Sequence, residues 1–178
     1  WTPDACRKVI RLVDLAQTFH LPVVHLVDIP GFLIGTQAER DGVMRFGTQA
    51  LAVVRQSSVP WCAIVVRKAF GMAALAQRNG SKMFMRYAWP SARWGSLPIA
   101  GGVDAAYRAQ IEAAPDPAKL RAEIEAKLEA VQSPVRTAEA FGVEEIIDPR
   151  ETRSYLCRFA NLVAPLRAAG APSFGYRP

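Results

Sequence analysis

Short apolar runs that alternate with helical patterns most constrain the fold of this chain. Residues 21–27 and 59–66 are dense in Val, Ile and Leu, and both are far shorter than the roughly 18 to 20 residues that span a bilayer. Runs of this length with many β-branched residues predict strands buried in a sheet. Amphipathic helical patterns precede them at 3–19 and 37–56. The alternation predicts an α/β fold with mainly parallel strand pairing.

The same periodicities and turn residues divide the rest of the chain. The expected elements are, in order, a short helix at 72–77, a strand at 83–90, a loop at 91–103, helices at 103–113, 118–131 and 134–142, a strand at 143–147 and a helix at 151–166. Residues 168–178, rich in Ala, Gly and Pro, are expected to form a loose tail, so the predicted domain covers residues 1–167.

The net charge of +6 comes from one stretch of the chain. Residues 67–110 hold seven Lys and Arg against a single acid, while the segments on either side are almost neutral. A basic chain can bind nucleic acid, but no recognition motif accompanies this charge, and several of the basic residues fall in predicted strands. We therefore expect neither a nucleic-acid nor a membrane partner, and the local charge favours a small anionic ligand.

No familiar group of catalytic side chains is present in the sequence. The three cysteines match neither a disulfide framework nor a metal site, so we predict no metal and a reducing, cytoplasmic location. His20 closes the first predicted helix, and His25 lies inside a strand, where a core histidine with satisfied hydrogen bonds is favoured over a catalytic base. Asp28 follows that strand, and we interpret it as orienting the next turn, with a role in chemistry as the alternative.

Backbone chemistry is the remaining possibility, at the two strand-to-turn junctions 28–34 and 67–73. At the second junction, Gly71, Met72 and Ala73 would open a helix whose first N–H groups have no partner within it. Two such amides can form an oxyanion hole, which stabilises an enolate or ureido oxyanion without a side-chain acid or base. The alternative is that the glycine only permits close packing of helix against strand.

Four segments carry a resemblance to a known family. They are Val27–Gln37, with Asp-Ile-Pro-Gly-Phe; Arg67–Ala73, Arg-Lys-Ala-Phe-Gly-Met-Ala; Ala88–Ala92, Ala-Trp-Pro-Ser-Ala; and Pro134–Arg150, ending in Ile-Asp-Pro-Arg. Together, and in this order, they resemble the carboxyltransferase β subunits of acyl-CoA carboxylases, of the propionyl-CoA carboxylase type. Two features depart from that family: Met72 stands where the family has a second glycine, and residues 93–102 differ from the segment that usually follows Ala-Trp-Pro.

The resemblance implies a crotonase-like fold of ββα units. The chain is similar to the C-terminal carboxyltransferase domain alone, without its opening strands. The implied partners are an N-terminal carboxyltransferase domain, of the same or a partner subunit, and a biotin carboxyl carrier or biotin carboxylase subunit, within a homo-oligomer. The implied reaction moves CO₂ from carboxybiotin to the α-carbon of a short-chain acyl-CoA, after the biotin anion or a close equivalent removes the α-proton.

The resemblance also assigns residues. The N–H groups of Met72 and Ala73, next to Gly71, are expected to hold the ureido oxygen of biotin. The residues expected at the biotin and acyl-CoA sites are Gly31, Phe32, Phe70 and Leu75, although Leu75 is also interpreted as an ordinary core leucine. Two other functions remain open: decarboxylation of a malonyl-type thioester, and a non-catalytic assembly module.

Overall fold

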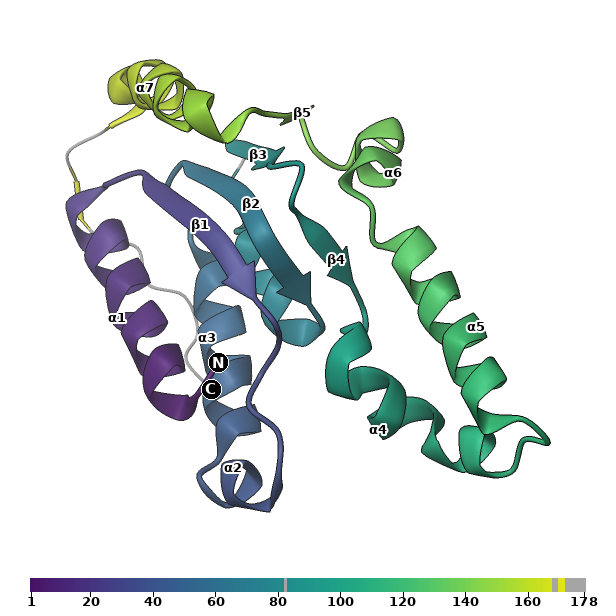
Figure 1. Cartoon of the computed structure of the whole chain (residues 1–178). Coiled ribbons are helices and arrows are strands. Elements are labelled where there is room, and N and C mark those ends of the chain that lie inside the picture. Colours follow the sequence, from purple (N-terminus) through teal and green to yellow (C-terminus); the bar gives the residue numbers. More distant parts are fainter. Residues whose placement is uncertain (82, 168–169, 172–178) are drawn as a thin grey trace.

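The described residues, 1–81, 83–167 and 170–171 of the computed structural model, form an α/β structure around a parallel sheet (Figure 1). The strands are β1 (Val23–Ile29), β2 (Trp61–Phe70), β3 (Phe84–Ala88), β4 (Arg93–Gly95) and β5 (Glu145–Ile146). They lie in the order β1-β2-β3-β5, β4 pairs with β2, and every pairing is parallel. The predicted α/β class and parallel pairing are confirmed.

Helices make up much of the rest of the described structure. The α-helices are α1 (Pro3–Phe19), α2 (Thr36–Arg40), α3 (Val43–Gln56), α4 (Ile99–Glu112), α5 (Pro117–Val131), α6 (Pro134–Glu139) and α7 (Thr152–Val163). The short 3-10 helices are η1 (Met72–Gln77), η2 (Pro149–Glu151) and η3 (Ala164–Leu166). None of the helices in the described residues is both long and apolar enough to cross a membrane.

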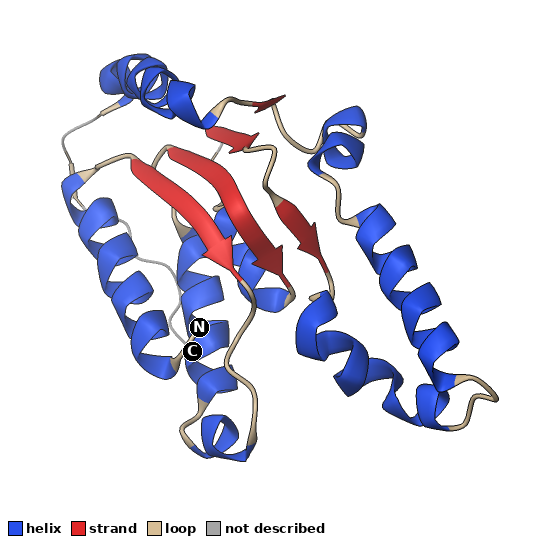
Figure 2. Ribbon diagram, in the orientation of Figure 1, coloured by secondary structure: helices blue, strands red, loops and turns tan. Residues whose placement is uncertain are grey.

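Three clusters of buried side chains hold the layers together. Helices α1 and α3 lie together on one side of the sheet (Figure 2), and the main cluster joins them to β1 and β2 through residues such as Val13, Val54 and Val65. Helix α7 packs with β2 and β3 in a second cluster that includes Cys62 and Phe159. Burial raises the pKa of the Cys62 thiol to about 12, as expected for an inert core cysteine. Helices α4 and α5 form a hairpin around a small cluster of their own.

The first helix has the ends that its sequence predicts. The Thr2 hydroxyl accepts a hydrogen bond from the N–H of Ala5 (3.2 Å), and Pro3 occupies the first turn, where its missing N–H costs nothing. At the other end, His20 takes a left-handed conformation (φ 54°), and its N–H donates to the carbonyls of Ala16 and Gln17. His20 therefore closes the helix, as expected.

Strand β1 is buried on one face only, which corrects the prediction of two fully buried strands. Val24 and Leu26 are 44% and 56% exposed, whereas all residues from Trp61 to Val65 of β2 are buried. The difference arises because β1 is the edge strand of the sheet and the α7 cluster reaches β2 and β3 but contains no residue of β1.

Several predicted boundaries were wrong. The helix expected at 37–56 is interrupted by Asp41 and Gly42, since Gly42 adopts a positive φ (76°) that ends α2 before α3 begins. Strand β2 continues through 67–70, which we expected to belong to the junction that follows the strand. This extension gives β4 a partner inside the predicted loop at 91–103. Helix α4 begins earlier than expected, at Ile99, with a kink at the following two residues.

The elements near the C-terminus are shorter than expected, with α6 ending at Glu139 and β5 limited to two residues. Most of the predicted tail at 168–178 lies outside the described residues, so its loose character stays a prediction.

Candidate functional site

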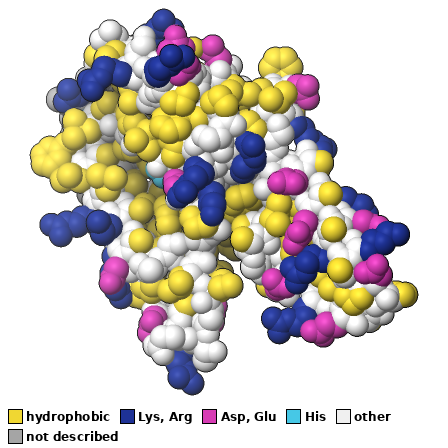
Figure 3. Space-filling view, in the orientation of Figure 1, with side chains coloured by type: hydrophobic (Ala, Val, Ile, Leu, Met, Phe, Trp, Pro, Cys, Tyr) yellow, Lys and Arg dark blue, Asp and Glu magenta, His cyan; other side chains and the backbone are white. Residues whose placement is uncertain are grey.

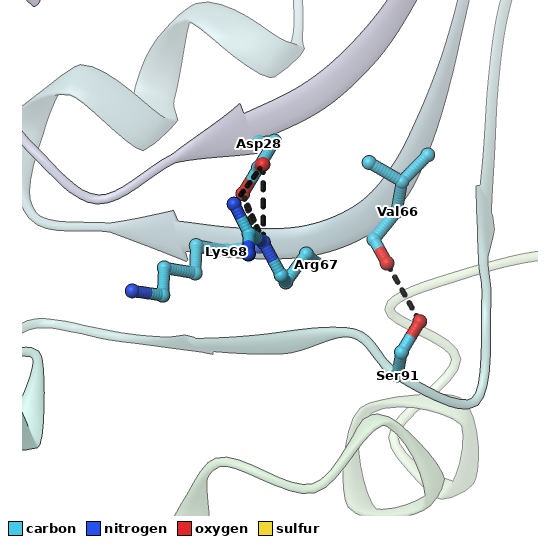
Figure 4. Close-up of polar contacts among 5 residues, drawn as sticks. All are labelled: Asp28, Val66, Arg67, Lys68 and Ser91. Atoms are coloured by element: carbon cyan, nitrogen blue, oxygen red, sulfur yellow. Dashed lines mark hydrogen bonds and ion pairs between the residues drawn. The ribbon is translucent and has the colours of Figure 1, made fainter.

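The site is built around a local irregularity at the carboxyl ends of β1 and β2. Val27 pairs with Val65, but Ile29 pairs with Ala69, so β2 accommodates extra residues against one residue of β1. Asp28 stands opposite this bulge, and its carboxylate accepts hydrogen bonds from Arg67 Nη2 (2.8 Å) and Nε (3.1 Å) (Figure 4). It also accepts one from the backbone N–H of Lys68 (3.1 Å).

These contacts explain the role of Asp28. The hydrogen bonds from Arg67, aided by the Lys68 N–H, hold the pKa of the Asp28 carboxyl below its usual value. The carbonyl of Val66, which lies inside the bulge, accepts a hydrogen bond from the Ser91 hydroxyl (2.7 Å; Figure 4). Both groups fix the path of β2 toward the turn that follows, which supports the interpretation of Asp28 as an orienting residue.

Gly71 makes that turn possible. Its backbone (φ 62°, ψ −158°) lies in a region that is essentially restricted to glycine, and its N–H donates to the carbonyl of Gly95 in β4 (3.0 Å). Helix η1 starts at the next residue. Within the described residues, no oxygen accepts a hydrogen bond from the N–H of Met72 or Ala73, whereas the N–H of Ala74 donates to Gly71 (3.2 Å). The turn thus has two consecutive N–H groups without an acceptor among the described residues; that of Met72 belongs to a half-exposed residue and that of Ala73 to a fully buried one.

A pocket of about 480 Å³ opens beside this turn. Its lining comes from β2, the turn, η1, β3, β4 and the α6 region: Ala69, Gly71, Met72, Ala74, Leu75, Gln77, Arg86, Trp94, Gly95, Ser96 and Thr137. Of these lining residues, none carries a carboxyl, imidazole, thiol or amine group. The pocket therefore offers backbone donors, amide, hydroxyl and guanidinium groups rather than a general base.

The structure brings some of the predicted site residues together here. Gly71, Met72 and Leu75 line the pocket, and the side chains of Met72 and Leu75 are each 48% exposed. The exposure of Leu75 does not fit an ordinary core leucine. Ala73 and Phe70 are buried, at 0% and 3% exposure, and do not line the pocket, so both support the turn from the core and the N–H of Ala73 has no exposed surface.

Gly31 and Phe32 are not part of this pocket lining. The Phe32 ring packs so closely on Gly47 that a Cβ at position 47 would lie 2.7 Å from it. On its other side the ring meets Trp1 edge-on, with 6.2 Å between the ring centroids. These contacts fix the loop after β1 against α3, and the cofactor-binding role of Gly31 and Phe32 stays a prediction.

The sequence places Arg86 of β3 near the site only as part of the positive excess, and it gives no signal for two other lining residues, Trp94 in β4 and Thr137 in α6. Trp94 donates its indole N–H to the Thr137 hydroxyl and so joins β4 to α6 at the pocket wall. The only sequence signal for Arg86 is a charge within a strand of apolar and aromatic residues, in the stretch that carries the positive excess.

Part of the positive charge of residues 67–110 lies on strands β2 and β4. Lys68 in β2 is paired in register with Arg93 in β4, and Lys and Arg side chains stand over these two strands in the middle of one face (Figure 3). In the described part of the chain, no group of three or more His, Cys, Asp and Glu residues could hold a metal ion.

His25 differs from the expectation of a satisfied core histidine. Its ring is largely buried in an apolar environment beside Trp61, and within the described part of the chain its Nδ1 has no hydrogen-bond partner. Burial lowers the pKa of His25 to about 4, opposed by a hydrogen bond involving the backbone of Ala76. His25 is therefore neutral at pH 7 and lies outside the lining of the pocket beside Gly71.

This lowered pKa predicts an acid-sensitive stability. Unfolded His25 titrates near 6.5 and folded His25 near 4, so its full contribution is present above pH 6.5 and is lost as the pH falls toward 4. Between pH 7.5 and 5.0, the loss should be about 2 kcal/mol of unfolding free energy. Urea unfolding at the two pH values measures how much unfolding free energy the protein loses. In His25→Leu this loss should be smaller by the same amount, and a loss equal to that of the unaltered protein would contradict a buried, neutral His25.

Comparisons with known proteins agree with the resemblance noted in the sequence. Residues 1–169 match the carboxyl transferase domain family. The chain is 36% identical over 168 residues to the methylmalonyl-CoA carboxyltransferase 12S subunit of Propionibacterium freudenreichii subsp. shermanii, covering 92% of this chain and 32% of that protein. It is 33% identical over 174 residues to the propionyl-CoA carboxylase beta chain of Saccharopolyspora erythraea, covering 93% and 32%.

Solved structures give the same result for the fold. A crystal structure of transcarboxylase 12S, described as a hexamer assembly, superposes with a TM-score of 0.81 at 32% identity, over 99% of this chain and 35% of that one. The β subunit of P. aeruginosa geranyl-CoA carboxylase has a TM-score of 0.82 over 98% of this chain and 35% of that one, and at 24% identity it supports the fold alone. The crotonase-like α/β fold is thereby confirmed.

The chain spans about a third of the length of these relatives. The family match extends over all four segments from which the resemblance was inferred, including the junction at 67–73. This chain belongs to the carboxyl transferase domain family, as an acyl-CoA carboxyltransferase β-like domain.

Proposed function

We propose that residues 1–167 form the carboxybiotin-facing, C-terminal half of a biotin-dependent acyl-CoA carboxyltransferase. The acyl acceptor would be a short-chain acyl-CoA of the propionyl or acetyl class. An N-terminal carboxyltransferase domain, of the same or a partner subunit, would bind this acyl-CoA, and a biotin carboxyl carrier or biotin carboxylase subunit would deliver the biotin. We further propose a homo-oligomer that acts in the cytoplasm.

One observation carries this proposal: the N–H groups of Met72 and Ala73 have no acceptor among the described residues, and Met72 lines a pocket whose lining contains no general base. A ureido oxygen fits such a pair, because it is a strong acceptor and gains negative charge when the ring loses its carboxyl group. The two donors are fixed before any ligand binds, since Gly71 and the Gly95 carbonyl set the turn. Biotin, when bound, supplies the carboxyl group that is transferred.

The other residues of the chain support these donors. The Asp28–Arg67 pair and Ser91 hold β2 in the bulged path that leads into Gly71. Met72, Leu75 and Trp94 give the pocket apolar walls, which suit the uncharged part of a ligand.

A transfer assay on the complete protein, with any further domains it carries, tests the proposal. Malonyl-CoA or methylmalonyl-CoA is supplied with free biotin, and the formation of the decarboxylated CoA ester is followed. We expect product formation to depend on biotin. An equal rate without biotin would instead favour a malonyl-type decarboxylase, and no reaction by a normally assembled protein would favour an assembly module.

A further inference from the structure

Arg86 is a half-buried cation whose guanidinium forms no ion pair with a carboxylate of the described residues. It lies on β3 and lines the pocket together with Gln77 and Trp94. Among the described residues, no oxygen accepts a hydrogen bond from its guanidinium. The nearby carboxylate of Glu144 accepts from the backbone N–H of Arg86 instead. A guanidinium that has lost part of its hydration without gaining a partner is costly, which points to a partner supplied by a ligand.

The charges around Arg86 define what that ligand can carry. Burial lowers the pKa of Arg86; the negative charge of Glu144 opposes this shift, and the positive charge of Arg78 adds to it. The Arg78 guanidinium lies over the Phe84 ring, 5.1 Å from its centroid, and Arg78 does not line the pocket. Glu144 and Arg78 do not line the pocket and their formal charges cancel, so the charged group of the lining is the single positive charge of Arg86. A monoanion neutralises this charge, whereas a dianion would be repelled by Glu144.

The shape and polarity of the pocket further limit which ligands can bind beside Arg86. Its walls are mostly apolar, from Ala69, Met72, Leu75 and Trp94, so the ligand should carry a small apolar body. The guanidinium is also confined, since a Cβ at Gly142 would lie 3.2 Å from its Nη2 atom. A planar guanidinium in a fixed position matches the two oxygens of a carboxylate.

We infer that Arg86 gives this pocket a binding site for a single carboxylate group carried on a short apolar body. Two sources share this chemistry: the terminal carboxylate of a malonyl-type acyl thioester and the carboxylate of an N-carboxylated ureido ring. The existence of the site does not depend on the proposed transferase function, whereas the choice between these two sources rests on it. Arg86 would position the transferred carboxyl group next to the free donors of the turn.

Binding of propionate to the complete protein tests the site, with ligand-observed saturation-transfer NMR as the readout. The Arg86→Met variant keeps the length of the side chain and removes its charge, and we expect its affinity to fall about 10- to 100-fold. Arg78→Met removes a neighbouring arginine that does not line the pocket and serves as the matched control, with a change of less than about threefold. Arg86→Lys should retain part of the binding, because it keeps the positive charge but lacks the planar guanidinium that can donate two parallel hydrogen bonds to a carboxylate.

Several results would overturn the inference. Propionate that fails to bind the unaltered protein, or binds Arg86→Met equally well, excludes a carboxylate site at Arg86. Inorganic phosphate that binds as tightly, with the same dependence on Arg86, contradicts the preference for a monoanionic carboxylate. This assay measures binding and needs no turnover. Propionate can therefore bind even if the protein transfers no carboxyl group, and carboxyl transfer can occur even if propionate does not bind.

The source of the carboxylate is determined by comparing malonyl-CoA with acetyl-CoA, which differ by that one group. If Arg86 holds the acyl carboxylate, Arg86→Met weakens malonyl-CoA binding about tenfold and leaves acetyl-CoA binding unchanged. If both CoA esters bind the variant normally while propionate binding is lost, the carboxylate comes from the ureido side. Equal weakening of both esters would show a general loss of structure and would count against the site.

Discussion

Replacing Met72 by Pro is expected to slow carboxyl transfer by the complete protein about 100- to 1,000-fold, the usual effect of losing one oxyanion donor. Proline removes the N–H of the first residue of η1 and leaves the rest of the chain unchanged. Its ring fits there, since the first helical position requires a φ near −65° and has no intrahelical hydrogen bond to lose. Gly71, which precedes it, already has an extended ψ of −158°, compatible with a following proline.

The matched control for this variant is Met72→Ala, which removes the same side chain and keeps the N–H. The rate ratio between the two variants isolates the backbone donor from any effect of the thioether on access to the pocket. Position 72 is better suited to this test than position 73, because the Ala73 side chain is fully buried and a larger ring there would overpack the core. Equal transfer rates in two variants with equal thermal stability would contradict a donor role for Met72.

The parts of the fold that follow from local sequence were predictable. The runs that became β1 and β2 are short, β-branched and bounded by turn residues, and α1 carries its own N-cap at Thr2 and its own stop at His20. Such signals depend on residues a few positions apart in the chain, so they can be recognised without knowing the tertiary contacts. The turn at Gly71 was predictable for the same reason, because the glycine and the start of the helix are adjacent in sequence.

The pocket was not predictable from those signals. The sequence assigns residues 67–70 to the junction after the strand, yet they continue β2, with Arg67 and Lys68 exposed and the next two residues buried. Only this extension makes Arg93–Gly95 a strand, since three residues have no periodicity of their own. Arg86 and Thr137 then reach the pocket through contacts between elements 50 residues apart in the sequence, and no local pattern encodes such contacts.

Replacing Gly71 by Ala is expected to destabilise the protein and to slow transfer at the same time. A methyl group at position 71 has space, because the nearest atom, the Ser96 carbonyl oxygen, would be 3.8 Å away. The cost is in the backbone, where φ 62° with ψ −158° strains any residue with a Cβ by about 1–3 kcal/mol. If the turn relaxes to relieve this strain, the N–H groups of Met72 and Ala73 turn away together. The transfer rate should then fall by at least about 100-fold, the effect of losing one donor.

The Gly42→Ala variant separates these two effects. Gly42 also has a positive φ (76°, with ψ 33°), in the left-handed region that costs a non-glycine residue about 1–2 kcal/mol. It lies between α2 and α3 and does not line the pocket, and a Cβ there would make only an ordinary contact with the Phe46 ring, at 3.7 Å. Both variants should lower the midpoint of thermal unfolding by roughly 2–4 °C per kcal/mol, but only Gly71→Ala should lose transfer activity. If the rate fell in both variants in proportion to stability, Gly71 would serve the fold alone, and the oxyanion role of the turn would be wrong.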